Sequence, residues 1–285
     1  MFLEQNNRSS YKQFARYLAT IRRFMEERDI VEVITNPLMS RIVPDRGVDP
    51  LTVNLGIGDY YLHTSPEWEM KKALCQGAGS IYQMVNVFRD DLSQNWHKPA
   101  FIMLEWYELD KDEDALIEQC LALFGALGLD YAPQIYSCRD LYHKVLGFDV
   151  LNVTIPMLEG VCKKHAIDYE GLQDKEHMSS WLEIIWVSLI EPSLSGLTVV
   201  KDFPLCQSAL AKIDHHPHER ARRFEILIDG CEIANGYFEE TDTRELSKRF
   251  AEYQGPHKVV SAQEISNLPS CSGVSIGVER LYAFL

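Results

Sequence analysis

The sequence predicts an α+β fold in which helices accompany antiparallel hairpins, and three stretches support this prediction. Residues 101–107 alternate with period two after the apolar run 81–88, which indicates a β-hairpin closed by the polar loop 90–99. Asp229-Gly230 separates two further apolar runs and is typical of a tight hairpin turn. Residues 11–28, in contrast, carry apolar side chains at the spacing of an amphipathic helix.

The composition indicates a chain with one large core. Its 285 residues are 46% hydrophobic, and the longest apolar runs are too short to span a bilayer. The N-terminus lacks the pattern of a signal peptide, and seven scattered cysteines favour reduced thiols, so we expect a cytoplasmic protein. A net charge of −14 disfavours a broad nucleic-acid surface, because such surfaces neutralise phosphates with Lys and Arg.

The N-terminal elements follow from local signals. After the helix at 11–28, residues 30–34 predict a short strand that ends before Pro37, and Gly56-Ile57-Gly58-Asp59 predicts a turn between strands. Thr64 and Glu67 are spaced as a capping box, so a helix is expected to begin there.

The remaining elements are predicted in the same way. Pro66 suits the first turn of the helix after Thr64, and Gly77 suits its end. Periodicity then predicts strands at 81–88, at 224–228 and from 231 onwards. It predicts helices at 113–129, 157–165 and 178–190. A helix is expected over 242–253 with Thr241 as its cap. The glycine-punctuated run 271–277 predicts a strand leading into a helix about one turn long.

Glu105 is the first candidate functional residue. It shares a strand face with Phe101, Met103 and Tyr107, and burying an unpaired carboxylate is costly. A cation is therefore expected near Glu105. The residues alone leave two alternatives open, namely a structural Arg or Lys and a cationic ligand.

Three separated motifs, taken together, resemble the catalytic domain of class II aminoacyl-tRNA synthetases. They are Phe88-Arg89, residues 232–239 and residues 271–281, and they occur in the family's order. The sequence is most similar to the lysine branch, and within it to stand-alone paralogues of lysyl-tRNA synthetase that modify elongation factor P. The resemblance extends from about residue 11 to 281 and is weakest over 111–197.

The resemblance implies one catalytic domain over 1–285, an antiparallel sheet flanked by helices, and no anticodon-binding domain. It also implies a homodimer, because 11–28, 30–34 and Pro37 are similar to the motif that builds the family's dimer interface. The implied activity is ATP-dependent: lysine or (R)-β-lysine becomes an aminoacyl-adenylate, and the acyl group passes to a lysine side chain of elongation factor P. Use of tRNA is not expected on so acidic a chain.

The resemblance also assigns roles to residues. Arg89 and Arg280 are the implied catalytic residues, because a guanidinium group binds phosphate oxygens bidentately and keeps its charge. Arg89 would contact the α-phosphate and the substrate carboxylate, and Arg280 would lie over adenine, with Phe101 on the other face of the ring. The implied ATP-binding residues are Arg89, Asp90, Asp91, Lys98, Phe101, Glu232, Ile233, Gly277 and Arg280.

The implied substrate-binding residues combine carboxylates with an aromatic wall, which suits an ammonium group. They are Ser65, Pro66, Glu67, Glu105, Tyr107, Asn235 and Glu239. Glu232 and Glu239 are also the implied Mg²⁺ ligands, since Mg²⁺ prefers carboxylate oxygens. Their odd spacing would send them to opposite faces of a regular strand, so a bulge or bend is expected at Asn235-Gly236.

The sequence departs from the family pattern in three places. Ala100 replaces a Glu that helps hold adenine, Lys98 stands where Asn or His is usual, and the chain stops four residues after Leu281. The residues also allow two other functions. One is acylation of tRNA or of a small amine by the same chemistry, and the other is a catalytically inactive, synthetase-like regulatory subunit.

Overall fold

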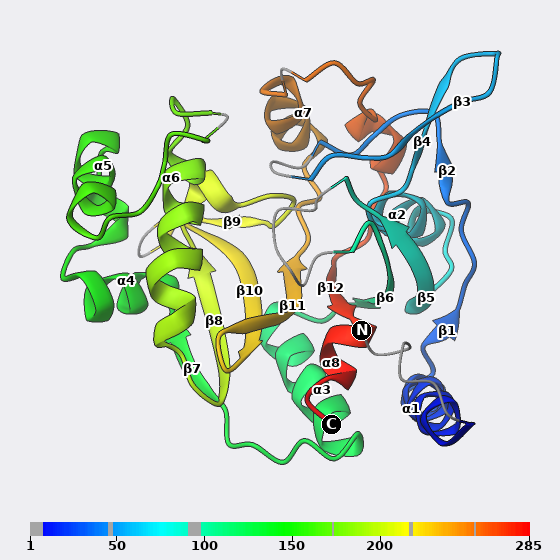
Figure 1. Ribbon diagram of the computed structural model, residues 1–285. Coiled ribbons are helices and arrows are strands. Elements are labelled where there is room, and N and C mark those ends of the chain that lie inside the picture. The colour runs from blue at the N-terminus through cyan, green and yellow to red at the C-terminus, as the bar shows by residue number, and fades with distance from the viewer. Residues whose placement is uncertain (1–7, 45–47, 91–97, 173, 217–218, 254) are drawn as a thin grey trace. The chain divides into compact units, whose positions relative to one another are not determined.

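The computed structural model describes residues 8–44, 48–90, 98–172, 174–216, 219–253 and 255–285 (Figure 1). The chain divides into two compact units. Unit 1 comprises Met1–Asp130 and Phe238–Leu285, and unit 2 comprises Tyr131–Tyr237. The expected single catalytic domain over 1–285 stays a prediction.

The sheet of unit 1 carries the predicted hairpin. Its strand order is β1-β5-β6-β12. The strands are β1 (Val31–Glu32), β5 (Ile81–Phe88), β6 (Ala100–Leu109) and β12 (Cys271–Gly277). β1 is parallel to β5 at the edge, and the other pairs are antiparallel. Because β6 has a neighbour on each side, with Glu105 opposite Gln83 and Ser275, this glutamate lies inside the sheet.

Helices and a small second sheet complete most of unit 1. The helices α1 (Arg8–Glu26) and α3 (Glu113–Ala126) confirm the predicted helices at 11–28 and 113–129. α3 packs against α1 and β12. The second sheet has the order β2-β4-β3, formed by Leu38–Met39, Asp59–Leu62 and Thr52–Asn54. The turn predicted at 56–59 joins β3 to β4.

The helix α2 (Glu67–Cys75) begins without the predicted capping box. The N-cap residue is Pro66, and no side chain caps the helix. Ser65 Oγ instead accepts a hydrogen bond from the Glu67 amide at 3.4 Å. The prediction was wrong because the side chain of Glu67 bonds to Lys71 one turn further on rather than back to Thr64. Gly77, at φ +85°, follows the helix as expected.

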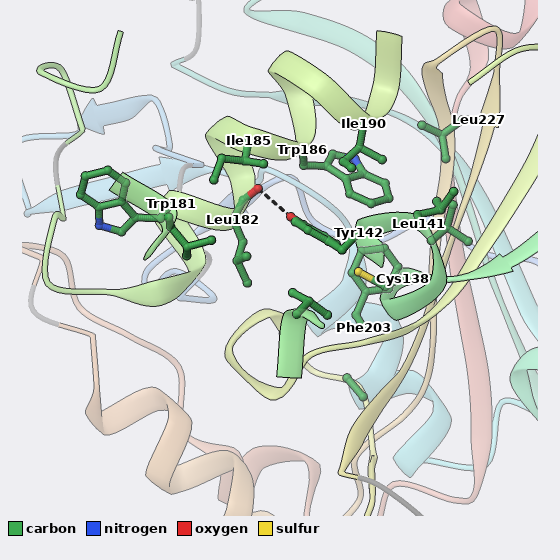
Figure 2. Close-up of a cluster of buried hydrophobic side chains, with 14 of the residues drawn as sticks. Cys138, Leu141, Tyr142, Trp181, Leu182, Ile185, Trp186, Ile190, Phe203 and Leu227 are labelled. Carbon is green, nitrogen blue, oxygen red and sulfur yellow. Dashed lines mark hydrogen bonds between the residues drawn. The ribbon is translucent and has the colours of Figure 1, made fainter. Parts of the chain in front are cut away.

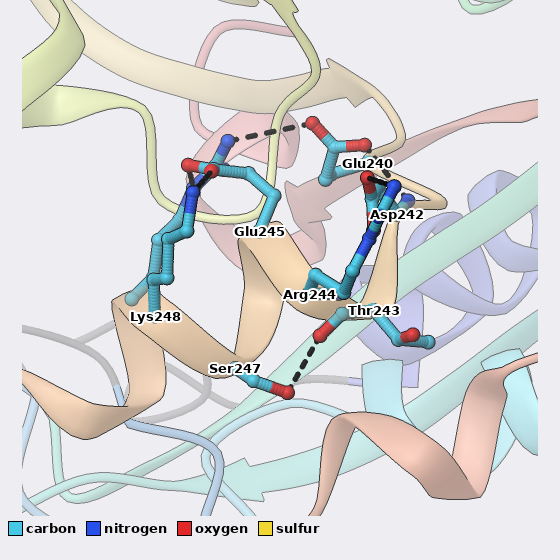
Figure 3. A network of polar contacts seen from close by, with 8 residues as sticks. Glu240, Asp242, Thr243, Arg244, Glu245, Ser247 and Lys248 are labelled. Atoms are coloured by element: carbon cyan, nitrogen blue, oxygen red, sulfur yellow. Dashed lines mark hydrogen bonds and ion pairs between the residues drawn. The ribbon is translucent and has the colours of Figure 1, made fainter.

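The helix α7 (Thr243–Ala251) corrects a second predicted cap (Figure 3). Its N-cap is Asp242, whose carboxylate accepts from the Arg244 amide at 2.9 Å, and not Thr241. Glu240 explains the difference, because its carboxylate accepts from the amides of both Thr241 and Asp242. The helix therefore begins one residue later than the Thr241 cap would place it.

Unit 2 contains strands in the order β11-β10-β8-β7, with β9 paired to β10 and β7 parallel to β8. The strands are β7 (Gln134–Ser137), β8 (Leu197–Phe203), β9 (Ile213–Asp214), β10 (Arg220–Ile228) and β11 (Cys231–Phe238). Asp229 and Gly230 have φ values of 49° and 76°, which is the left-handed backbone that a two-residue hairpin turn requires. The hairpin predicted at this dipeptide is confirmed.

The bulge in β11 lies earlier than the sequence predicts. Ala234 pairs with Ile226 and Glu232 pairs with Leu227, so Ile233 is the extra residue. Asn235 and Gly236 pair regularly with β10. The predicted position was wrong because Asn-Gly resembles a turn, whereas the bulge allows both Ile233 and Ala234 to be buried.

Helices and aromatic side chains form the core of unit 2 (Figure 2). The helices are α4 (Cys138–Leu146), α5 (Ile155–Lys164) and α6 (Met178–Ile185), and α6 continues as a π-helical turn over Trp186–Ile190. Tyr142, in the middle of the cluster, donates to the Leu182 carbonyl at 3.0 Å. The predicted helices at 157–165 and 178–190 are confirmed.

Candidate active site

An acidic cluster in unit 1 gathers side chains from separate parts of the chain. Glu67 and Lys71 come from α2, Glu105 and Tyr107 from β6, and Glu239 from the residue after β11. The side chains of Lys71 and Glu239 are each only 1% exposed. The sequence predicted four of these residues for substrate binding and missed Lys71.

Lys71 links two of the carboxylates. Its Nζ donates to Glu67 Oε1 at 2.5 Å and to Glu239 Oε2 at 2.6 Å, and it lies 5.9 Å from the centre of the Tyr107 ring. Burial alone would lower the pKa of Lys71, but the charges of Glu239 and Glu67 outweigh it and hold that pKa above its usual range. Lys71 is therefore a fixed ammonium group.

Glu105 forms the second part of the cluster. Its Oε1 accepts a hydrogen bond from the Tyr107 hydroxyl at 2.7 Å. Burial, followed by the nearby charge of Glu67, raises the pKa of Glu105 to about 8. Lys71 is the cation expected near Glu105, although its hydrogen bonds go to Glu67 and Glu239. Three carboxyl groups surround one ammonium, so the cluster can accept a second cation as Glu105 loses its proton.

Gly273 makes the close packing of this cluster possible. It pairs with Tyr107 across β6 and β12. A Cβ atom at Gly273 would lie 2.2 Å from Tyr107 Cε1 and 2.7 Å from Glu239 Oε1. Both distances are far below van der Waals contact, so only glycine fits at this position.

The backbone on either side of Glu239 fixes the position of its side chain. The Glu239 amide donates to the Cys271 carbonyl at 3.0 Å. The next residue, Glu240, accepts from two amides at the start of α7 and lies 3.5 Å from Arg249 Nη2 (Figure 3). Glu239 is thus held between β12 and α7, which explains how it reaches Lys71.

Arg89 lies at the mouth of the β5–β6 hairpin. Its Nε donates to the Thr64 carbonyl at 3.2 Å, and its guanidinium carbon lies 5.3 Å from the centre of the Phe101 ring. The Arg89 amide bonds to the Pro99 carbonyl. Arg89, Phe101 and Ser65 therefore lie near the same turn, although the contact to Phe101 is one that the sequence did not predict.

The structure describes most of the other residues that were predicted to bind ATP. Lys98 and Asp90 are exposed, and the Asp90 amide bonds to the Asp49 carbonyl at 2.8 Å. Asp91 lies outside the described residues. Gly277 ends β12 and is the N-cap of α8 (Val278–Tyr282), which carries Arg280 in its first turn.

Two residues that the sequence did not single out hold α8 in place. The Glu279 carboxylate accepts from the Ile102 amide at 2.9 Å, which ties α8 to β6. The Tyr17 hydroxyl of α1 donates to the Val278 carbonyl at 3.0 Å. Together they set the direction of the turn that carries Arg280. No local signal in the sequence identifies contacts between residues so far apart.

Unit 2 carries the other predicted residues. Glu232 and Asn235 are partly exposed on β11, and Ile233 is buried. Arg223 forms a buried ion pair with Glu225, and its Nε donates to Asn235 Oδ1 at 3.3 Å. Burial raises the pKa of Glu225 to about 8, while the charge of Arg223 opposes this shift.

One of the two predicted Mg²⁺ ligands, Glu239, already bonds to a lysine. Glu232 belongs to unit 2, and Glu239 to unit 1, where its Oε2 is engaged by Lys71. Within the described residues, no group of three or more His, Cys, Asp or Glu side chains could hold a metal. Lys71 would thus compete with a metal ion for this carboxylate, and the predicted pair stays a prediction.

Comparison with known proteins identifies the family. The family model for class II tRNA synthetases of the D, K and N group matches residues 2–285. The chain belongs to the class II tRNA synthetases. Among the parts of this family member that the structure describes, no helix is both long and apolar enough to cross a membrane.

Relatives of this synthetase chain carry the name elongation factor P–(R)-β-lysine ligase. The protein from Proteus mirabilis is 33% identical over 94% of this chain and 88% of its own length. Those from Haemophilus ducreyi and Vibrio cholerae are each 31% identical, over 94% and 96% of this chain and 86% and 90% of their own lengths. The predicted family, its α+β fold and its ligase class are confirmed.

Proposed function

We propose that this class II synthetase is an ATP-dependent ligase that acts on lysine or (R)-β-lysine and on elongation factor P. In the first step, a carboxylate oxygen of the amino acid attacks the α-phosphorus of ATP, which yields an aminoacyl-adenylate and pyrophosphate. In the second step, a lysine amine of elongation factor P attacks the carbonyl carbon. An amide forms, and AMP and a proton leave.

The buried acidic cluster carries this proposal. Glu67, Glu105 and Glu239 surround Lys71 and the Tyr107 ring, and carboxylates beside an aromatic face suit an alkylammonium group. The names of the relatives support lysine-type substrates and elongation factor P as acceptor. In the proposal Ser65, Pro66 and Asn235 border the same amino acid.

Arginine side chains supply most of the proposed catalysis. Activation places a weak nucleophile beside a highly charged triphosphate, so the protein must neutralise charge and align the reactants. Arg89, beside Thr64 and Phe101, would hold the α-phosphate and the carboxylate, and Arg280 would hold the far end of ATP. Asp90, Asp91, Lys98, Phe101, Glu232, Ile233 and Gly277 complete the proposed ATP site.

ATP reaches such an enzyme together with Mg²⁺, which neutralises phosphate charge when bound. Glu232 is the proposed carboxylate for this ion. Glu239 would join it in competition with Lys71. Removing divalent ions with a chelator should therefore abolish activation without disturbing the Lys71–Glu239 pair.

A mass measurement tests the acceptor. The purified chain is mixed with ATP, (R)-β-lysine or lysine, and elongation factor P, and the intact mass of the factor is recorded. We expect an increase of one lysyl group that requires ATP and is absent when the acceptor lysine of the factor is replaced by arginine. An unchanged mass with both amino acids would exclude this acceptor.

The first half-reaction is tested separately by amino-acid-dependent exchange between ATP and pyrophosphate. Glu105→Gln should raise the KM for the amino acid far more than the KM for ATP, because only the side-chain ammonium uses this carboxylate. If the KM for the amino acid and the KM for ATP change equally, Glu105 is a structural residue.

The same assays separate the alternatives. Acylation of tRNA with a steep salt dependence, and an unmodified factor, would favour the tRNA alternative. Absence of exchange with every amino acid would favour the inactive regulatory subunit. The net charge of −14 makes extensive contacts to nucleic acid unfavourable, and the proposal therefore does not include tRNA.

We include a homodimer and a cytoplasmic location in the proposal. Tyr11, Val31 and Ile34 leave apolar surface near α1 and β1, and Ile34 is 94% exposed. Covering such surface would favour self-association. Light scattering of the purified chain checks the dimer, and a monomer at all concentrations would contradict it.

A further inference from the structure

Lys71 is the ammonium group inside the acidic cluster. We propose, resting on the proposed function, that its side chain permanently fills one of two cation positions in this cluster. It confines the side-chain ammonium of the substrate to the other position, beside Glu105 and Tyr107. Lys71 is thus a positioning residue that determines where the amino acid lies.

The first cation position is defined by the bonds of Lys71. Its Nζ lies within 2.6 Å of oxygens from both Glu67 and Glu239, and its side chain is 1% exposed. Lysine is almost never so fully buried unless it is paired. Two carboxylates that converge on one point form a strong cation site, and this chain occupies that site with its own side chain.

The second position is defined by Glu105 and Tyr107. Glu105 is 3% exposed, and it accepts a hydrogen bond from the Tyr107 hydroxyl at 2.7 Å. A carboxylate has about four acceptor sites, so this bond leaves capacity for an ammonium group. Lys71 supplies one charge to three carboxyl groups, and a second ammonium beside Glu105 would favour the ionised form of that carboxyl group.

Removal of Lys71 should misplace the substrate rather than expel it. With the first position vacant, the ammonium of lysine would be drawn between Glu67 and Glu239. The other end of the molecule would then move away from Arg89, so the carboxylate would no longer align with ATP. Amino-acid binding should persist while the rate of activation falls.

A binding experiment tests the cation position without any assay of activity. Lys71→Ala leaves a space that matches n-propylammonium, which restores the three outer carbons and the nitrogen of the lysine side chain. We expect n-propylammonium to raise the Tm of Lys71→Ala by at least about 2 °C. The neutral analogue n-propanol should have no such effect, and n-propylammonium should raise the Tm of the unmodified chain by less than that of Lys71→Ala.

Kinetics of ATP–pyrophosphate exchange test the positioning role. For Lys71→Ala we expect a kcat lowered by roughly 30-fold or more, with the KM for lysine within about threefold of its original value. n-Propylammonium should restore most of the kcat. Lys72→Ala is the matched control, because Lys72 lies next along α2, has a side chain 34% exposed and pairs with Glu69 at 2.8 Å. The kcat and the KM for lysine should both stay unchanged in Lys72→Ala.

Each contrary result has a distinct meaning. A raised KM with an unchanged kcat would overturn the proposal, because Lys71 would then support affinity alone. Restored Tm without restored kcat would also overturn it, because the role would be structural. If the unmodified chain activates no lysine-type amino acid, the proposed function fails. The Tm shift then decides separately whether the cation position exists.

A second variant applies if Lys71→Ala does not fold. Lys71→Met combined with Glu67→Gln and Glu239→Gln removes the ammonium together with both carboxylates that bond to it. Because the first position is then no longer anionic, the substrate should return to Glu105, and measurable exchange is expected. A folded triple variant that binds lysine but shows no exchange would contradict the proposal.

Discussion

At the scale of single residues, the acidic cluster depends on close packing at Gly273 and on the charge of Lys71. Tyr107 bonds to Glu105 on one strand, and its ring lies against Gly273 on the next. Lys71 supplies the internal positive charge. Each of these residues acts through neighbours brought together by the fold, so their removal should have effects beyond their own contacts.

Gly273→Ala should disrupt the cluster. Its Cβ would overlap the Tyr107 ring at 2.2 Å, and overpacking of this kind costs about 1–3 kcal/mol of stability. Urea denaturation measures this loss, and amino-acid affinity should fall with it. Gly125→Ala in α3 is the control, because nothing lies within 4 Å of the added atom there, and it should be about 0.5–1 kcal/mol more stable. Equal effects at both positions would contradict the close packing.

Arg89→Ala should slow activation without unfolding unit 1. Loss of one preorganised donor to a developing charge costs on the order of 3 kcal/mol, or about 150-fold in rate. The folded structure loses only a bond to the Thr64 carbonyl and a contact to Phe101. Steady-state exchange kinetics check the rate. Near-normal activation by this variant would remove Arg89 from the proposed mechanism.

At the scale of elements, helix starts were the least predictable features. Both predicted caps were wrong, because Glu67 bonds forward to Lys71 and Glu240 occupies the amides of Thr241 and Asp242. The strands were more predictable, since alternation over 81–88 and 101–107 requires only a two-residue period. The bulge at Ile233 shows the limit of that pattern, because one extra residue changes which side chains are buried.

The cap of α7 gives a prediction at this scale. Asp242→Ala removes the acceptor for the Arg244 amide and should cost about 1 kcal/mol. Thr241→Ala removes no cap and should change stability by less than about 0.5 kcal/mol. Thermal unfolding of the two variants distinguishes them. The reverse order would restore Thr241 as the cap.

At the scale of the whole molecule, both units bury carboxylates whose pKa values are raised. Burial is the leading cause in each case, and it raises the pKa of Glu105 and Glu225 to about 8 and that of Glu239 to about 7, from an ordinary 4.5. Glu105 and Glu239 lie in unit 1 and Glu225 lies in unit 2, so the stability of each unit should depend on pH. Their stabilising contribution is greatest when they are protonated.

Stability should therefore fall as the pH rises from 6 to 9. Across this range the folded chain holds more protons on these groups than the unfolded chain, whose carboxyl groups titrate near about 4.3, and so the free energy of unfolding decreases with pH. Urea denaturation at several pH values measures this slope. It should persist at high salt, because buried charges are weakly screened. A flat or rising profile would contradict the raised pKa values.

The sequence by itself determined the order of helices and strands, the family, and most residues of the acidic cluster. Periodicity and turn residues are local, and each of the three motifs can be recognised within a short window. Only the tertiary structure decided that Lys71 is fully buried and paired with Glu239. In the sequence, Glu67 and Lys71 form an ordinary helical pair worth a few tenths of a kcal/mol. The third partner lies 168 residues away, and only folding brings its carboxylate to the same ammonium group.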